Sequence, residues 1–162
     1  MPMPRPGAVP ALQAGLLGLA TGARSMTGLA AYALTRPSSP SSPQPERALG
    51  HRWVRTGLLL LAAAEVVADK LPGAGSRLQP PALAARLVVA AGLGVLVARQ
   101  GAAGLPSSAW ATVPTAVLAG LGWSVLGSHW RGWASRHFGP DLPGAVLEDV
   151  AAGTLAWAAT RT

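Results

Sequence analysis

The longest uncharged stretch of the chain constrains its fold more than any other feature. Residues 100–130 carry no formal charge at neutral pH, and Trp110 and Trp130 bracket most of this stretch. Twenty helical steps of about 1.5 Å span roughly 30 Å, the thickness of the hydrocarbon layer of a bilayer. Tryptophans at both ends of such a helix are typical of membrane–water interfaces. The stretch therefore predicts a transmembrane helix, with Pro114 in its first turn, where proline is tolerated.

The composition of the whole chain agrees with a lipid environment. Half of the 162 residues are hydrophobic and only 12% are charged, whereas soluble domains carry about 25% charged residues. Aromatic residues make up only 5%, so the apolar excess consists of Ala, Leu, Gly and Val. A small soluble domain has too much surface for such a composition, but lipid tails solvate it directly. We therefore expect an all-α membrane protein.

Four further apolar runs complete the predicted architecture, at residues 8–35, 53–68, 82–98 and 144–160. Together they indicate one membrane domain over residues 1–162, a polytopic helical bundle of about five short transmembrane helices. We expect the first crossing to be interrupted near residues 22–28, because glycine and a mid-membrane Arg24 weaken a continuous helix. The alternative for this run is a cleaved signal peptide, with Arg5 as its basic residue and residues 11–20 as its apolar core.

The connections between the runs are polar or rich in proline. Residues 1–7 are predicted to be disordered, and residues 37–46 form a Pro/Ser-rich segment that we expect to be an extramembrane loop. Pro80 and Pro81 suit the first turn of the third run. Residues 129–138 are either an interfacial segment or an ordinary loop. In the interfacial interpretation, Arg131 and Arg136 contact anionic lipid headgroups.

Small residues recur at four-residue spacing in four of the runs. This pattern lets membrane helices approach each other closely and predicts a compact helical bundle. We also expect the protein to form a homo-oligomer. The residues concerned are Ala14, Gly18 and Gly22; Ala90, Gly94 and Ala98; Ala116, Gly120, Ser124 and Ser128; and Ala152, Ala156 and Thr160.

Ionisable residues within or beside the apolar runs are the candidate site. A charge at the centre of an inserted helix costs about 2.5–3.5 kcal/mol, so such residues persist when they pair, face water or serve a function. Those predicted to lie at this depth are Arg24, Glu65, Asp69, Arg86, Glu148 and Asp149.

The spacing of the acidic residues predicts where counter-charges are needed. Glu65 and Asp69 are four residues apart and share a helix face, so they require a cation between them. That cation is Arg24, Arg86, Lys70, a bound ion or a proton. Two adjacent acidic residues, 148 and 149, point about 100° apart on a helix. We expect one of them to face the same centre as Glu65 and the other to cap a helix N-terminus.

Two interpretations of these charges remain open at this stage. In the first, Arg24 and Arg86 neutralise Glu65 and Glu148 as buried pairs that fix the bundle. In the second, the same residues form a pathway for a substrate or a proton. Interrupted helices expose free backbone groups at membrane depth, and Ser25 and Thr27 would present hydroxyls beside Arg24 to an anionic or polar solute.

Several other classes of function have no support in the sequence. The chain has no cysteine, and His51, His129 and His137 lie in predicted loops or interfaces without a third metal ligand. No nucleophile triad or phosphate-binding loop is present, so we expect neither an enzyme nor a cofactor. The net charge is +7, but arginines in short connections are typical of membrane proteins, and we expect no nucleic-acid partner.

Four motifs resemble a known family. GARSMT at residues 22–27, EVVADKLP at 65–72, SRLQPP at 76–81 followed by Arg86, and EDVA at 148–151 occur in this order. The chain is similar from about residue 11 onward to bacterial membrane proteins grouped as domain of unknown function 4126. It departs from them in a longer Pro/Ser segment and in Leu78, where a small hydroxyl residue is more usual. The resemblance implies a bacterial cytoplasmic (inner) membrane protein and supplies no activity.

The sequence thus leads to three functional hypotheses. The first is a membrane protein that binds or moves a small ion or polar solute near Arg24, Glu65 and Glu148. The second is a structural scaffold or partner subunit whose buried charges only fix helix packing. The third is a holin-like pore former, against which the interior charges argue.

Overall fold

The structure, a computed structural model, describes residues 8–35, 42, 44–68, 78–100, 107–138 and 142–162, which form helices and no strand. The prediction of an all-α fold is confirmed. The helices are α1 (Ala8–Ala23), α2 (Ser25–Thr35), α3 (Glu46–Gly50), α4 (Arg52–Ala68), α5 (Pro80–Ala98), α6 (Ala109–Phe138) and α7 (Leu142–Ala159). Residues 1–7 and most of the Pro/Ser segment lie outside the described residues.

Most helix boundaries agree with the apolar runs, and Pro80 and Pro81 occupy the first turn of α5 as expected. The short helix α3 was not predicted. The position of Pro114 was predicted wrongly, because α6 begins at Ala109 and its second turn contains this proline. Helix α6 also continues without a break through residues 129–138. The interpretation of these residues as an ordinary loop is therefore wrong.

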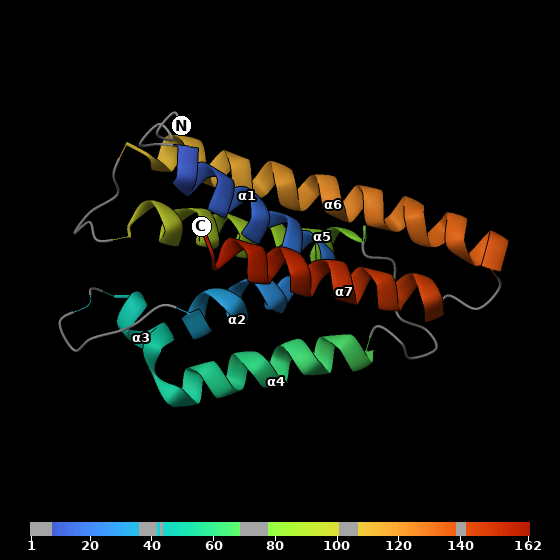
Figure 1. Cartoon of the computed structure of the whole chain (residues 1–162), viewed down its shortest axis with the longest axis horizontal. Coiled ribbons are helices and arrows are strands. Elements are labelled where there is room, and N and C mark those ends of the chain that lie inside the picture. The colour runs from blue at the N-terminus through green and yellow to red at the C-terminus, as the bar shows by residue number, and fades with distance from the viewer. Residues whose placement is uncertain (1–7, 36–41, 43, 69–77, 101–106, 139–141) are drawn as a thin grey trace.

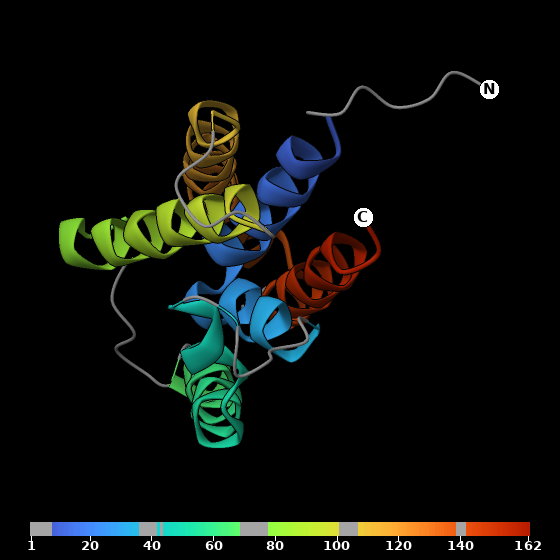
Figure 2. The same cartoon turned by 90° about the vertical axis from the view of Figure 1, so that its left-hand side faces the viewer.

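The first apolar run forms a helical hairpin rather than one interrupted crossing. Only Arg24 separates α1 from α2, so the predicted break lies where expected. However, α2 turns back along α1 (Figures 1 and 2): a Cβ on Gly28 would lie 2.9 Å from the carbonyl oxygen of Leu17. In a straight helix these two residues would be roughly 16 Å apart. The prediction of a single crossing for this run is wrong, and Arg24 is the apex of a hairpin.

Helix α1 lies at the centre of the bundle, where glycines allow its close approach to α6. A Cβ on Gly18 would lie 2.3 Å from the carbonyl oxygen of Ala116, and a Cβ on Gly22 would lie 2.3 Å from that of Gly120. Ala14, Ala90 and Ala152 are also buried. The predicted small-residue packing is confirmed.

Hydrogen bonds place the start of α1 and the ends of α5 and α7 at one end of the bundle. Gln13 donates to the carbonyl of Ala159 at 2.8 Å, and Gln100 donates to the Gln13 side chain at 2.7 Å. At the same end, Tyr32 near the end of α2 donates to the carbonyl of Leu96 at 3.1 Å. The α1–α2 hairpin therefore enters the bundle from this end and returns to it (Figure 1).

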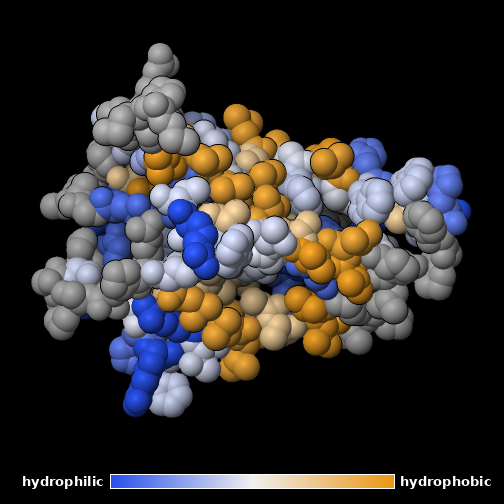
Figure 3. Space-filling view, in the orientation of Figure 1, coloured by the Kyte–Doolittle hydropathy of each residue, from blue (hydrophilic) through white to orange (hydrophobic). Residues whose placement is uncertain are grey.

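On the face drawn in Figure 3, apolar residues gather between two ends that carry hydrophilic residues. Leu60, Val88 and Leu118 are each at least 65% exposed, whereas Arg24 is 2% exposed. Arg86 and Glu148 are also buried, beside an otherwise apolar core, whereas charged residues are seldom fully buried in a soluble domain. Within the described residues, α5 and residues 109–137 of α6 are long and apolar enough to cross a membrane, and α1 is a shorter apolar helix.

Candidate functional site

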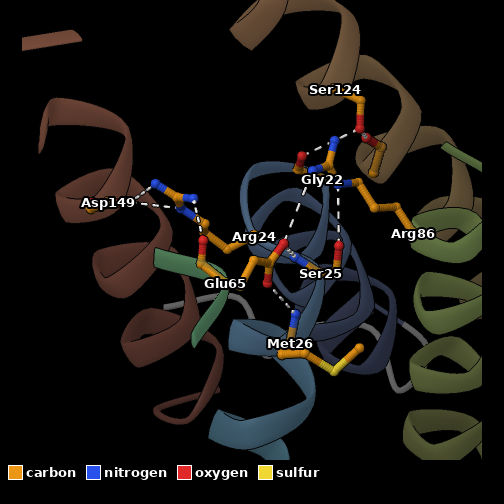
Figure 4. A network of polar contacts seen from close by, with 9 residues as sticks. Gly22, Arg24, Ser25, Met26, Glu65, Arg86, Ser124 and Asp149 are labelled. Carbon is orange, nitrogen blue, oxygen red and sulfur yellow. Dashed lines mark hydrogen bonds and ion pairs between the residues drawn. The ribbon is translucent and has the colours of Figure 1, made fainter. Parts of the chain in front are cut away.

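The break between α1 and α2 is held by an ion pair between Arg24 and Asp149 of α7. The Nε of Arg24 donates to Asp149 Oδ1 at 2.6 Å, and its Nη2 contacts the same oxygen. Arg24 Nη1 also donates to the backbone carbonyl of Glu65 at 3.4 Å. Figure 4 shows the Arg24 side chain extending from the hairpin toward α7. The apex of the hairpin is thereby joined to residues far along the chain.

Glu65 of α4 caps the start of α2. Its Oε1 accepts a hydrogen bond from the backbone N–H of Ser25 at 2.8 Å, and its Oε2 accepts one from that of Met26 at 3.0 Å. The first N–H groups of a helix have no partner within the helix and carry partial positive charge. A carboxylate is favourable there, and this one is supplied by another helix. Because α4 packs mainly against α2, this contact attaches a peripheral helix to the site (Figure 2).

Arg86 of α5 approaches the same carboxylate from the opposite side. Its Nε donates to Ser25 Oγ at 3.2 Å, and its Nη2 lies 4.0 Å from Glu65 Oε1. Close by, Ser124 of α6 donates to the carbonyl of Gly22, the penultimate carbonyl of α1, at 3.3 Å. Both backbone ends at the break are thus contacted by polar side chains of neighbouring helices (Figure 4).

The predicted pairing of the charges is partly corrected by this geometry. Arg24 pairs with Asp149 rather than with the carboxylate of Glu65, which lies nearer to Arg86. Glu148 is 3% exposed and faces α6, where its Oε1 would lie 3.0 Å from a Cβ on Gly127. The expectation that one of the two adjacent acidic residues joins the centre is confirmed. The N-terminus of α2 is capped by Glu65 instead of by Glu148.

The remaining predicted residues take part less directly or cannot be placed. Thr27 lies half-buried in the first turn of α2, where its backbone N–H donates to the carbonyl of Arg24 at 3.2 Å. Asp69 and Lys70 lie outside the described residues. The site as described therefore consists of Arg24, Ser25, Glu65, Arg86 and Asp149, which come from the hairpin, α4, α5 and α7.

Two contributors to the site were not predicted as part of it. The backbone N–H of Met26 carries no signal in a side-chain pattern, because any residue at that position offers the same donor. Ser124 was predicted only as one member of a small-residue row. Its second hydrogen bond, to the carbonyl of Gly120 at 2.8 Å, is the ordinary bond of a helical serine, and its approach to Gly22 depends on how closely α1 packs.

This arrangement places backbone N–H groups without a helical partner next to side chains of both charges. Two guanidinium groups and two carboxylates surround a helix break whose N–H groups bind an anion, here the carboxylate of Glu65. Arg24 is nearly inaccessible, whereas the side chains of Glu65 and Asp149 are 20% and 22% exposed. The two carboxylates are thus more exposed than the two arginines that they face.

Comparison with known proteins adds no family to this description. No protein-family model, curated protein or solved structure matches the chain. The resemblance to domain of unknown function 4126 therefore stays a prediction.

Proposed function

We propose that this protein is a polytopic integral membrane protein that binds and moves a small ion at the break between α1 and α2. The membrane location is supported by exposed apolar side chains on the helices and by three charged residues buried among them, Arg24, Arg86 and Glu148. Exposed contiguous apolar surface of this kind marks contact with lipid or with another protein. In the membrane, α4, α5, α6 and α7 cross the bilayer, and the α1–α2 hairpin re-enters it.

The ion-binding role rests on one observation: charged side chains from four parts of the bundle meet at a buried helix break. Non-helical backbone at membrane depth is tolerated where it is buried in protein or lines a polar cavity, and ion sites of transporters are built in this way. Glu65 occupies the N-terminus of α2 while remaining partly exposed. It is therefore placed to exchange its hydrogen bonds for those of an incoming ion or proton.

Ion movement is tested by reconstituting the purified protein into liposomes and measuring fluxes of protons, common cations and common anions. We expect a flux above that of empty liposomes for at least one ion. We expect Glu65→Gln, which removes the charge with little change of shape, to reduce this flux to the level of empty liposomes. Glu46→Gln in α3 is the matched control, because this carboxylate lies outside the site. The proposal is wrong if Glu65→Gln and Arg24→Ala both leave the flux unchanged.

The hairpin also determines the proposed orientation. With four crossings and one re-entrant hairpin, the start of α1 and the end of α7 lie on the same side of the membrane. That end of the bundle carries five of the described arginines, Arg47, Arg52, Arg55, Arg99 and Arg161. Arg131 and Arg136 lie at the opposite end, where we propose that they contact anionic headgroups. The positive-inside rule places the end with five arginines in the cytoplasm.

Cysteine labelling tests this orientation directly, because the chain contains no cysteine. We expect a membrane-impermeant maleimide to label Ser135→Cys in intact cells. Val9→Cys and Thr162→Cys should be labelled only after permeabilisation. Opposite accessibility of Val9→Cys and Thr162→Cys would support five crossings and contradict the re-entrant hairpin.

A structural role is the second candidate, favoured by the burial of the Arg24–Asp149 pair. The two roles differ in the double variant Arg24→Met/Asp149→Leu, which replaces the pair by apolar side chains. If the charges only fix packing, this variant folds and gives the same flux as the unmodified protein. If the site moves an ion, the variant folds and the flux is lost.

A further inference from the structure

A groove between α6 and α7 lies open among exposed apolar side chains. It has a volume of about 330 Å³, at the lower end of the range for small-molecule sites. Trp123, Leu126 and Trp130 of α6 line one wall, and Leu147 and Ala151 of α7 line the other. Leu126 and Leu147 are more than half exposed, so an occupant can enter the groove from the side of the bundle.

The lining of this groove disfavours a polar or charged occupant. Its surface is almost wholly apolar. Glu148 belongs to the α7 wall but is only 3% exposed, so it presents no open carboxylate to an occupant. A charged group placed against such walls would lose its hydration without gaining a partner. In the proposed membrane location, the hydrocarbon chain of a lipid is the occupant that these walls favour.

Stacked rings continue the α6 wall toward the end of this helix. The ring centroids of Trp130 and Trp133 are 5.3 Å apart, and those of Trp133 and His137 are 4.5 Å apart. Trp130 and Trp133 are 38% and 41% exposed. Partly exposed tryptophans near the end of an apolar helix are typical of headgroup depth in a bilayer. A lipid chain in the groove would therefore have its headgroup beside the last turns of α6.

The last turns of α6 carry positive charge. Arg136 follows Trp133 by three residues, which makes the two residues neighbours on the helix surface. Arg136 is exposed, and α6 contains no acidic residue. Arginine forms strong charge-assisted hydrogen bonds with phosphate oxygens. We propose that the groove holds one acyl chain of an anionic phospholipid whose phosphate binds Arg136.

Lipid selectivity is tested by native mass spectrometry of the purified full-length protein in neutral detergent with added lipid. The probes are phosphatidylglycerol and phosphatidylcholine with identical acyl chains, so that they differ only in the headgroup. We expect one bound phosphatidylglycerol per protein, at concentrations about fivefold below those that phosphatidylcholine requires. About fivefold is the contribution of one arginine near an anionic lipid surface. Equal retention of the two lipids would overturn the proposal.

Two variants separate the headgroup contact from the acyl-chain contact. Arg136→Gln should lower the retention of phosphatidylglycerol to that of phosphatidylcholine. Ala151→Phe places a ring in the groove and should lower the retention of both lipids. Since Arg136 is exposed, the first variant is informative even if the second does not fold. Unchanged retention in Arg136→Gln, or in a folded Ala151→Phe, would contradict the proposal.

The matched controls lie on α7 outside the groove or just beyond its end. Arg161→Gln removes an exposed arginine at the opposite end of the bundle. Gly153→Phe adds a ring where a Cβ would meet no atom within 4 Å. Neither variant should change the retention of either lipid. A loss of selectivity in Arg161→Gln equal to that in Arg136→Gln would show a general effect of charge and refute the site.

The lipid site rests on the proposed membrane location of the bundle but not on ion movement at the helix break. A protein that remained folded and monomeric in buffer without detergent would refute the membrane location itself. Equal retention of the two lipids by a protein that needs detergent would refute only the lipid site. Disulfide crosslinking of two copies through Leu147→Cys in lipid bilayers would place a second copy over the groove and would also refute the lipid site.

Discussion

Replacing Arg24 by leucine is expected to lower the free energy of unfolding by about 3–5 kcal/mol, the usual cost of removing one partner of a buried ion pair. The guanidinium is 2% exposed and donates to Asp149 Oδ1 at 2.6 Å and to the Glu65 backbone carbonyl at 3.4 Å. Its loss leaves the partly exposed carboxylate of Asp149 without this cation. The hairpin apex also loses its contacts to α4 and α7. We expect the variant to unfold at a lower temperature or lower denaturant concentration, followed by circular dichroism in detergent.

Two further variants separate this pair from a general effect of lost charge. The double variant Arg24→Met/Asp149→Leu should recover most of the lost stability, because well-packed apolar residues replace buried ion pairs at little cost. Arg136→Leu, at an exposed arginine near the end of α6, should change stability by no more than about 0.5 kcal/mol. If Arg24→Leu were as stable as the unmodified protein, the ion pair would not hold the hairpin.

Valine at Gly22 or Gly18 is expected to lower the free energy of unfolding by about 3 kcal/mol, because neither site has room for a side chain. A Cβ at each position would lie 2.3 Å from a carbonyl oxygen of α6, and the backbone of α6 must move to accommodate it. Moving α6 away from Gly22 also separates Ser124 from the helix break. Thermal unfolding in detergent measures the first effect, and the liposome flux assay measures the second.

The matched control for these variants lies on α6 itself. A Cβ on Gly122 meets no atom within 4 Å, so Gly122→Val should have little effect on packing. Gly92→Ala on α5 is equally unobstructed and should stabilise its helix, since alanine is a better helix former than glycine by about 1 kcal/mol. If Gly22→Val and Gly122→Val were equally stable, the close approach of α1 to α6 would be refuted.

Much of the fold could be predicted because its signals are local. Apolar runs, the proline pair at residues 80 and 81 and the small residues of α1 and α6 each act within a few turns of one helix. Arg24 marked the break for the same reason. The direction in which the chain leaves that break is not local. It depends on Gly28 packing against Leu17 and on the hydrogen bond from Tyr32 to α5, which no window around Arg24 contains.

The same distinction between local signals and long-range contacts applies to the candidate site. The depth of Glu65, Arg86 and Asp149 could be predicted from the surrounding apolar residues. The pairing could not, because adjacent residues 148 and 149 point in different directions and the rotation of α7 decides which one meets Arg24. The capping of α2 by Glu65 could not be predicted either, because the carboxylate comes from α4 and binds backbone N–H groups that carry no sequence signal. Pro114 shows that a local signal can also mislead. Proline is most easily tolerated in the first turn of a helix, but α6 begins early enough for Pro114 to lie in its second turn.

The long sequence separation within the central ion pair has a consequence for biosynthesis. Arg24 and Asp149 are 125 residues apart, and Arg24 leaves the ribosome first. At about 5–20 residues per second, its partner follows on the order of 6 to 25 seconds later. During that interval the guanidinium lacks its acidic partner, so the contacts of the N-terminal hairpin are complete only after translation of α7. In the proposed membrane arrangement, we therefore expect final insertion of the hairpin to be a late event in assembly, although its residues are synthesised first.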